Sequence, residues 1–367
     1  MRRLLTAAAT ASLLLAQAPV LAEGTADDIG VMSVSLKETI KPRFGIQAQT
    51  QGAGTPNEVG VGGFLPISVG DNSVFYADIE VNANLSDFSG YSSIVNTQVE
   101  GVTVSTSSRL GYRWLHDDRS WMFGINAGYD SRPMNTGGTD TGINVSGTEE
   151  SAFFQQVAIN AEAVSNDWNF NVYGLIPVGD TEQDLNFFYQ GGALNTYGLD
   201  VAYFITPVVN ASVGYYYQYG DLGTADGSGV LGRLAYEMTS GLTAGVNISY
   251  DQAFDTRVSA DIKIRFGGSK ATEKRKEVQS LPVISSLMSS PGNRDVRVHD
   301  SCSRESIEIT SDKCARQREL DSFLNEKCGE AKGLYAEDSD YKVLGDKTFR
   351  DIFCKGKPPF PTNIIEV

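Results

Sequence analysis

The sequence predicts an all-β transmembrane fold, a twelve-stranded antiparallel barrel, followed by a small cysteine-containing and partly helical C-terminal region. Two observations carry this prediction. Apolar and polar residues alternate with a period of two in many segments, and the connections between those segments alternate between short and long. Strands that face lipid on one side and a water-filled interior on the other have this pattern, and their short turns lie at one end of the barrel.

Residues 1–22 have the organisation of a secretory signal peptide. Arg2 and Arg3 form a charged start, residues 4–21 are mostly apolar or small, and Ala22 ends the small-residue site where cleavage is expected. Polar residues and a proline interrupt the apolar run, which disfavours a membrane-spanning helix. Residues 23–41 show no clear period and are expected to form a short periplasmic leader.

The clearest hairpin pattern spans residues 110–129. Leu110, Tyr112 and Trp114 share one face of the first arm, and the apolar face of the second arm runs from Trp121 to Tyr129. The opposite faces carry small and polar residues instead of the charged surface of a soluble sandwich. Apolar faces that begin and end in aromatic residues suit strands lying between lipid and a lumen.

Twelve strands are expected within residues 42–267, which form the predicted transmembrane barrel domain. Alternation is cleanest in the third and the last two strands, whose apolar faces carry no charge; a charge there would cost roughly 2–4 kcal/mol at mid-bilayer. The turns after even-numbered strands are short, so the short side is expected to be periplasmic, whereas a soluble sandwich has no reason to alternate this way. The expected strands are 42–50, 58–67, 73–85, 102–115, 119–130, 152–164, 167–177, 196–204, 208–219, 229–238, 241–251 and 256–266.

Charged residues on the polar faces of these strands are expected to face the barrel interior. An interior of mixed charge suits either an open pore or a lumen that hydrogen-bonds a threaded plug. The expected lumen-facing residues are Asp78, Glu80, Arg109, Arg113, Glu162, Asp200, Arg233, Glu237, Arg257, Asp261, Lys263 and Arg265.

Charge and cysteine content divide the chain near Gly267. Residues 23–267 carry 11 Lys and Arg against 28 Asp and Glu, whereas residues 268–367 carry 17 of each. All the cysteines lie in the last 66 residues. We therefore expect a linker at residues 268–300 and a small four-cysteine domain at residues 301–367, with a helix over residues 311–331.

Cys302, Cys314, Cys328 and Cys354 are expected to form two disulfides. The chain is exported and has no CxxC pair, which favours disulfides over a metal site. Of the three possible connectivities, the one that joins Cys314 to Cys328 is disfavoured. If one helix carries both residues, they lie about 21 Å apart, beyond disulfide reach.

The sequence offers no catalytic or cofactor-binding constellation. His116 and His299 are the only histidines, one in an expected turn and the other in the expected linker. No nucleophile arrangement, phosphate loop or basic patch suited to nucleic acid occurs. We therefore predict a protein that is not an enzyme, holds no metal or cofactor and binds no nucleic acid.

The expected partners are the lipid and lipopolysaccharide of an outer membrane and the barrel-assembly machinery. Acidic residues in two long loops suggest either divalent-cation bridges to lipopolysaccharide phosphates or a solvated, repulsive surface, since no spacing matches a defined calcium loop. These acidic residues are Asp140, Glu149, Glu150, Asp180, Glu182 and Asp184.

Seven motifs in order resemble the inverse autotransporter β-domain of the intimin/invasin family. They are Phe64-Leu65-Pro66 to Ser73–Asp78, Leu110-Gly111-Tyr112-Arg113, Met122 to Asp130, Tyr173-Gly174-Leu175-Ile176-Pro177, Gly198-Leu199-Asp200-Val201, Tyr215 to Asp221, and Ile262 to Gly267. The resemblance implies a twelve-stranded barrel that anchors a C-terminal passenger and exports it across the outer membrane of a Gram-negative-type bacterium. The leader is too short for the peptidoglycan-binding module of many members, and only 100 residues follow the barrel.

Two function classes remain open from the sequence. In the first, the barrel anchors and exports its own short C-terminal passenger to the cell surface, where an unknown ligand would be met. In the second, it is a porin-like or structural outer-membrane barrel whose C-terminal tail stays in the periplasm. The side of the membrane that the tail occupies distinguishes the two classes.

Overall fold

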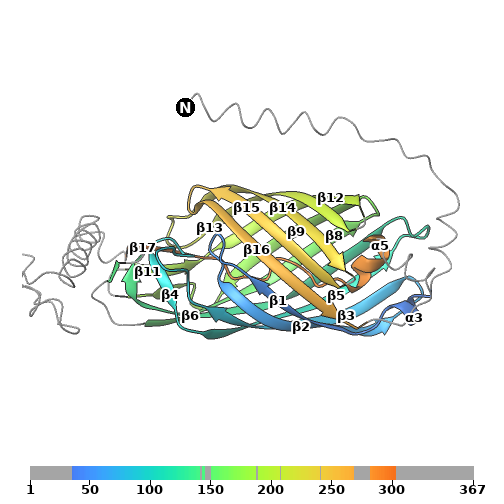
Figure 1. The fold of residues 1–367 in the computed structure, drawn as a ribbon, viewed down its shortest axis with the longest axis horizontal. Coiled ribbons are helices and arrows are strands. Elements are labelled where there is room, and N and C mark those ends of the chain that lie inside the picture. Colours follow the sequence, from blue (N-terminus) through green and yellow to red (C-terminus); the bar gives the residue numbers. More distant parts are fainter. Residues whose placement is uncertain are drawn as a thin grey trace, which may run out of the picture. The chain divides into compact units, whose positions relative to one another are not determined.

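A computed structural model describes residues 35–140, 143–144, 150–186, 189–206, 208–239, 241–267 and 282–302, all of which lie in the compact unit Ser35–Val367. Twelve antiparallel strands close into a barrel, because the first strand, β1, pairs with the last, β16 (Figure 1). Closure leaves no unpaired sheet edge within the wall, which is the condition for a sheet to cross a membrane. The predicted twelve-stranded barrel is confirmed.

The wall strands follow one another around the barrel in chain order. The expected segments agree with them to within two residues at each end, except at β6. The strands are β1 (Arg43–Gln49), β2 (Asn57–Val69), β3 (Ser73–Leu85), β5 (Thr103–Leu115), β6 (Met122–Asp140), β8 (Glu150–Val164), β9 (Trp168–Val178), β12 (Asn195–Thr206), β13 (Val209–Tyr219), β14 (Gly227–Thr239), β15 (Leu242–Asp251) and β16 (Asp255–Phe266).

Strand β6 extends well past residue 130, where the sequence pattern ends. Pro133 interrupts the pattern, and a proline cannot donate to a sheet ladder. In the structure Pro133 lies where β6 changes partners along one edge: the pairing with β5 ends at Ser131, and the pairing with β4 (Thr97–Glu100) begins at Asn135. The missing N–H group therefore interrupts no pair on that edge, and the strand continues.

The connections give the barrel two different ends. Short turns join β2 to β3, β5 to β6, β8 to β9, β12 to β13 and β14 to β15, and β16 finishes at the same end, which we call the short-turn end. The helical turn α3 (Leu36–Thr39) precedes β1 at this end. The opposite, long-loop end carries β4 and the short strands β7 (Ile143–Asn144), β10 (Glu182–Asp184) and β11 (Tyr189–Ala193).

Side chains alternate between the two faces of the wall. Along β3, Ile79 and Val81 are exposed on the outer face, whereas Asp78, Glu80 and Asn82 are buried on the inner face. The outer face is apolar around the barrel, as contact with lipid requires. The burial of charged groups on the inner face shows that protein, and not only water, fills the interior.

Part of the expected linker fills that interior. We call residues 282–302 the threaded segment; it contains α5 (Pro282–Ser285), the 3-10 turn η1 (Ser286–Met288) and β17 (Val298–Cys302). Figure 1 shows α5 at one end of the barrel and β17 at the other. The expected signal peptide, the helix at residues 311–331 and Cys314, Cys328 and Cys354 lie outside the described residues.

Helices make only a minor contribution to the part of the chain that is described. Among these residues, no helix has the length and apolar character needed to cross a membrane.

Candidate functional site: the barrel interior

The threaded segment runs from the short-turn end to the long-loop end. At its start, the Val283 N–H donates to Asn166 Oδ1, 3.4 Å away in the turn between β8 and β9. At its finish, β17 pairs antiparallel with β11, in the long loop between β9 and β12, from Ala193↔Val298 to Tyr189↔Cys302. The segment therefore spans the full length of the barrel interior. It runs in the direction opposite to β16, the wall strand that precedes it in the chain.

The start of the segment is apolar. Val283, Ile284 and Leu287 are fully buried, and Met288 is nearly so. The wall at this end also turns apolar side chains inward, unlike the polar wall farther along, and these are buried too: Val74, Leu115, Met122 and Val164. Burial of apolar area stabilises by about 25 cal/mol per Å², so this end contributes through the hydrophobic effect.

The middle of the segment is charged and meets charge of the opposite sign on β3. Arg294 Nη2 lies 2.5 Å from Asp78 Oδ1, and Arg294 Nε lies 3.7 Å from Glu80 Oε2. Ser290 Oγ donates to the other oxygen of Asp78 at 2.9 Å. Both wall carboxylates are almost inaccessible to water, so Arg294 supplies the positive charge that their burial requires.

Wall arginines bind the segment through its backbone. Arg113 Nη1 donates to the Ser289 carbonyl at 2.7 Å, and Arg109 Nη2 donates to the Asn293 carbonyl at 3.2 Å. Arg132 Nη1 donates to the Val296 carbonyl at 2.9 Å. Extended segments leave their carbonyls unpaired, and these arginines satisfy them without a neighbouring strand.

Arg297 is the second cation that the segment brings to the wall. Its Nη2 lies 3.3 Å from Asp251 Oδ2, and its guanidinium carbon lies 4.6 Å from the centre of the Tyr216 ring. Its Nε also donates to the Ala53 carbonyl at 3.1 Å. A desolvated cation held by a carboxylate and an aromatic face is worth more than an exposed ion pair.

The finish of the segment is held from both sides. One edge of β17 pairs with β11. On its other edge, the Val298 N–H donates to the Gly54 carbonyl at 3.1 Å, and the Asp300 N–H donates to the Ile94 carbonyl at 3.0 Å. The Asp300 carboxylate accepts the backbone N–H groups of Asn96 and Thr97, at 2.9 and 2.6 Å. Burial among the loops raises the pKa of Asp300 to about 7, and these hydrogen bonds oppose the rise only partly.

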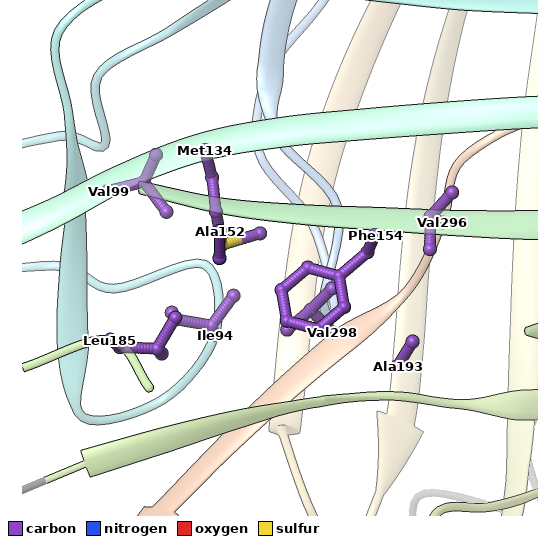
Figure 2. Packing of buried hydrophobic residues seen from close by; sticks show 9 residues of the cluster. All are labelled: Ile94, Val99, Met134, Ala152, Phe154, Leu185, Ala193, Val296 and Val298. Carbon is purple, nitrogen blue, oxygen red and sulfur yellow. The ribbon is translucent and has the colours of Figure 1, made fainter. Parts of the chain in front are cut away.

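An apolar cluster surrounds this finish. Val296 and Val298 pack with residues of the β3–β5 connection, β6, β8 and the β9–β12 loop, far from them in sequence (Figure 2). The wall and loop members are Ile94, Val99, Met134, Ala152, Phe154, Leu185 and Ala193. The segment thus has an apolar end at each mouth of the barrel and a charged part between them.

The predicted lumen charges mostly pair within the wall. Arg109 and Asp130 form a bidentate pair at 2.6 and 2.8 Å, and Arg113 Nε lies 2.7 Å from Glu162. On the opposite side of the barrel, Arg233 Nη2 donates to Asp261 at 3.0 Å. These pairs satisfy charges that would otherwise be desolvated at high cost.

The other predicted wall charges make a longer ion pair or contact uncharged groups. Arg265 Nη2 lies 3.8 Å from Glu80, and Glu237 accepts the Gly241 N–H at 3.1 Å. Arg257 donates to the Ser92 carbonyl at 2.8 Å. Asp200 lies near the side chains of Asn171 and Asn293, and Lys263 is half-buried near Glu80 and Asp261.

Sequence reasoning missed several charged residues of this interior, among them Asp130, Arg132, Asp251, Arg294 and Arg297. Asp130 and Arg132 continue the inward phase of Asn126 and Gly128 on β6, so extending the alternation past Asp130 would have found them. Asp251 lies at the end of β15. Arg294 and Arg297 lie in an aperiodic stretch, where no pattern indicates which way a side chain points.

The acidic loop residues do not assemble into a metal site in the part of the chain that the structure describes. There, no group of three or more His, Cys, Asp or Glu side chains has metal-binding geometry. Asp180, Glu182 and Asp184 lie at the long-loop end, and the side chains of Asp140, Glu149 and Glu150 lie outside the described residues.

Comparison with known proteins gives similarity in structure only. No protein-family model matches the chain, and no curated protein matches it. A chain from a study of the in-meso crystallization of membrane proteins is 10% identical with a TM-score of 0.50, covering 71% of this chain and 99% of that one. This likeness, together with the closed wall and apolar exterior, identifies the fold. The protein is an outer-membrane β-barrel.

Two further solved barrels are more distant. The Salmonella typhi outer membrane phospholipase dimer with bound calcium is 13% identical with a TM-score of 0.33, covering 65% of this chain and 96% of that one. The translocator domain of the autotransporter NalP from Neisseria meningitidis is 14% identical with a TM-score of 0.38, covering 62% and 88%. The barrel lies in the outer membrane of a Gram-negative bacterium, where its apolar exterior contacts lipid.

Proposed function

We propose that the protein anchors its own C-terminal region in the outer membrane and leads it through the barrel to the cell surface, in the manner of an inverse autotransporter. The observation that carries the proposal is the path of the threaded segment. It begins beside Asn166 in a short turn and ends in β17 among the long loops. Short turns face the periplasm in outer-membrane barrels, so the chain after Cys302 starts on the outer side.

The lengths of the parts agree with this path. Strand β16 ends at the short-turn end, and 15 residues separate its last residue, Phe266, from Pro282. Crossing a hydrocarbon core about 25–30 Å thick needs roughly 8–10 extended residues, and the threaded segment has more than twice as many. The segment therefore reaches the outer side with residues to spare for α5 and η1.

The sequence supports the same proposal independently. The order of signal peptide, barrel and tail, and the seven motifs that resemble the intimin/invasin barrel, are those of an inverse autotransporter. The proposal includes residues 1–22 as a cleaved signal, assembly by the barrel-assembly machinery, and two disulfides in the displayed tail. It includes no enzymatic step.

The test is the position of the C-terminus in intact cells. An epitope tag after Val367 should be removed by protease added outside, while the barrel stays in the membrane. Protection of this tag until the outer membrane is broken would reject surface display and favour the porin-like barrel with a periplasmic tail.

Two control tags calibrate the assay. A tag inserted after Asp117, in a short turn, should be protected in intact cells. A tag inserted at Gly223, between β13 and β14 at the long-loop end, should be accessible, because a Cβ built at Gly223 meets nothing within 4 Å. If the two control tags behave in the opposite way, the orientation of the barrel is reversed.

A further inference from the structure

We infer that the barrel interior is a receptor for a peptide with the sequence of the threaded segment, so that the C-terminal part stays bound when the connection through residues 268–281 is cut. In this inference, non-covalent contacts with the wall hold the tail, and the covalent link to β16 is dispensable once the barrel has assembled. The inference holds whichever side of the membrane the tail occupies, so it and the proposed function can fail separately.

The surface that the segment shares with the barrel runs the full length of the interior. Contacts run from Val283, beside the short turn at Asn166, to Cys302, paired with Tyr189 of β11. Six of the segment's apolar residues are almost completely buried, four near the short-turn end and two near the long-loop end. A peptide fixed at both ends of a channel cannot leave by fraying from one end alone.

The segment and the wall each supply charged groups to the other. The segment gives two cations to the wall, Arg294 to Asp78 and Arg297 to Asp251, and these wall carboxylates are otherwise buried without a cation of their own in contact. In return, the wall gives arginine donors to the segment's carbonyls. Removal of the segment would leave Asp78 and Asp251 without the only cation that contacts each of them among the described residues. Arg109 and Arg113 would keep their wall partners, Asp130 and Glu162, but lose the segment's carbonyls.

The C-terminal end of the segment binds as an added β-strand. At the long-loop end the segment pairs as β17 with β11 and is also bonded on its other edge by the Gly54 and Ile94 carbonyls. Extended peptides bind proteins in this way, with main-chain hydrogen bonds for affinity and side-chain pockets for specificity. Val298 and Asp300 occupy such pockets, one apolar and one lined by backbone N–H groups.

These features define the ligand. The receptor would take an extended peptide with an apolar helical turn at its N-terminal end, two arginines three residues apart in its middle, and a short strand with one acidic residue at its C-terminal end. Arg294 and Arg297 are the residues to change in a test, because their side chains form the ion pairs between the segment and the wall.

The experiment uses the full chain with a tag after Val367 and a site for a sequence-specific protease in place of residues 271–277. The purified protein is cut in mild detergent and passed over a gel-filtration column at high salt. We expect the tagged C-terminal fragment to elute with the barrel and to separate only after boiling. Separate elution of the fragment from a barrel that still shows the unboiled gel shift would overturn the inference.

A variant distinguishes binding from mechanical trapping. In R294E/R297E the cut fragment should be lost from the barrel fraction, because each change sets a carboxylate against Asp78 or Asp251. Retention of the fragment in this variant would mean that the chain is merely trapped in the channel, which also overturns the inference. K37E/K41E is the matched control: it makes the same charge change at two exposed residues outside the interior and should leave the fragment bound.

A second variant covers failure of the barrel to assemble. If R294E/R297E shows no gel shift, the pair D78R/R294E restores one contact with the charges exchanged. Its fragment should stay bound to higher salt than that of R294E alone. Equal loss from both proteins would show that the Asp78–Arg294 contact does not hold the segment.

Discussion

The two faces of the same wall strand follow different rules. On β3 the outer residues Phe75, Ile79 and Val81 touch nothing specific and stay exposed, whereas the inner residues Asp78 and Glu80 are buried against a segment more than 200 residues later in the chain. Lipid accepts any apolar side chain of suitable size, so the outer face needs hydrophobicity alone. The inner face needs particular partners, so a change there should depend on what each side chain contacts.

The largest effect is expected from breaking a buried ion pair of the interior. Arg109→Ala leaves Asp130, which is almost fully buried, without its bidentate partner, and also removes the donor to the Asn293 carbonyl. Removal of one member of such a pair costs about 3–5 kcal/mol. The check is the urea concentration at which the unboiled gel shift is lost.

Lys37→Ala is the control for that change. Lys37 and Asp71 form an ion pair 2.9 Å apart at the short-turn end, with both side chains largely exposed. Solvent screens such pairs, so no measurable change in the same urea assay is expected. An equal loss in both variants would contradict the distinction between interior and exposed charges.

The outer face is tested by adding a charge to it. Ile248→Arg places an arginine on the lipid face of β15, where Ile248 is 54% exposed, and should cost roughly 2–4 kcal/mol or prevent assembly. Asn247→Arg places the same residue on the inner face, next to Asp261, and should be milder. Equal damage would mean that the register is wrong, because a one-residue shift exchanges the faces.

A smaller effect is expected from adding a methyl group at a glycine that packs directly against an inward-facing tyrosine. A Cβ at Gly229 of β14 would overlap the ring of Tyr216, which donates to Asp251 and lies under Arg297. Gly229→Ala should therefore cost about 1–3 kcal/mol by overpacking and weaken retention of the threaded segment.

Gly232→Ala, three residues along the same strand, is the matched control. A Cβ there meets only Ile248 on the outer face, at an ordinary contact distance of 3.4 Å. The urea midpoint of this variant should stay close to that of the wild type. If Gly229→Ala is equally harmless, the Tyr216 ring moves more freely than the packing implies.

The smallest effect concerns pH at the long-loop end. Burial raises the pKa of Asp300 to about 7, above the ordinary value of 3.8. A raised pKa in the folded state gives a contribution to stability that is present below about pH 4 and is lost as the pH rises to 7. Attachment of β17 should therefore be weaker at pH 8 than at pH 5, as measured by proteolysis near Cys302.

Asp300→Asn should remove this dependence, because an amide does not titrate. The neighbouring His299 does not contribute to the difference between pH 5 and pH 8, since burial lowers its pKa to about 4 and its ring is neutral at both. A pH dependence that persists in Asp300→Asn would assign the effect to another group.

The sequence by itself determined the wall. Period-two alternation located all twelve strands, because each outer face meets the same solvent, lipid, and needs no knowledge of any other segment. The alternation did not locate the ends of β6, because whether Pro133 stops a strand depends on which partner strand lies beside it. The same alternation placed Asp78 and Glu80 on the inner face without indicating what they meet.

Only the tertiary structure decided what fills the barrel. Residues 282–302 have no period, and in sequence they resemble a linker of serines, prolines and scattered charges. Arg294 reaches Asp78 because the wall closes around the segment and desolvates both groups, a contact between residues 216 positions apart. A pair of that kind has no local signature, because its stability comes from the enclosed space that the completed barrel creates.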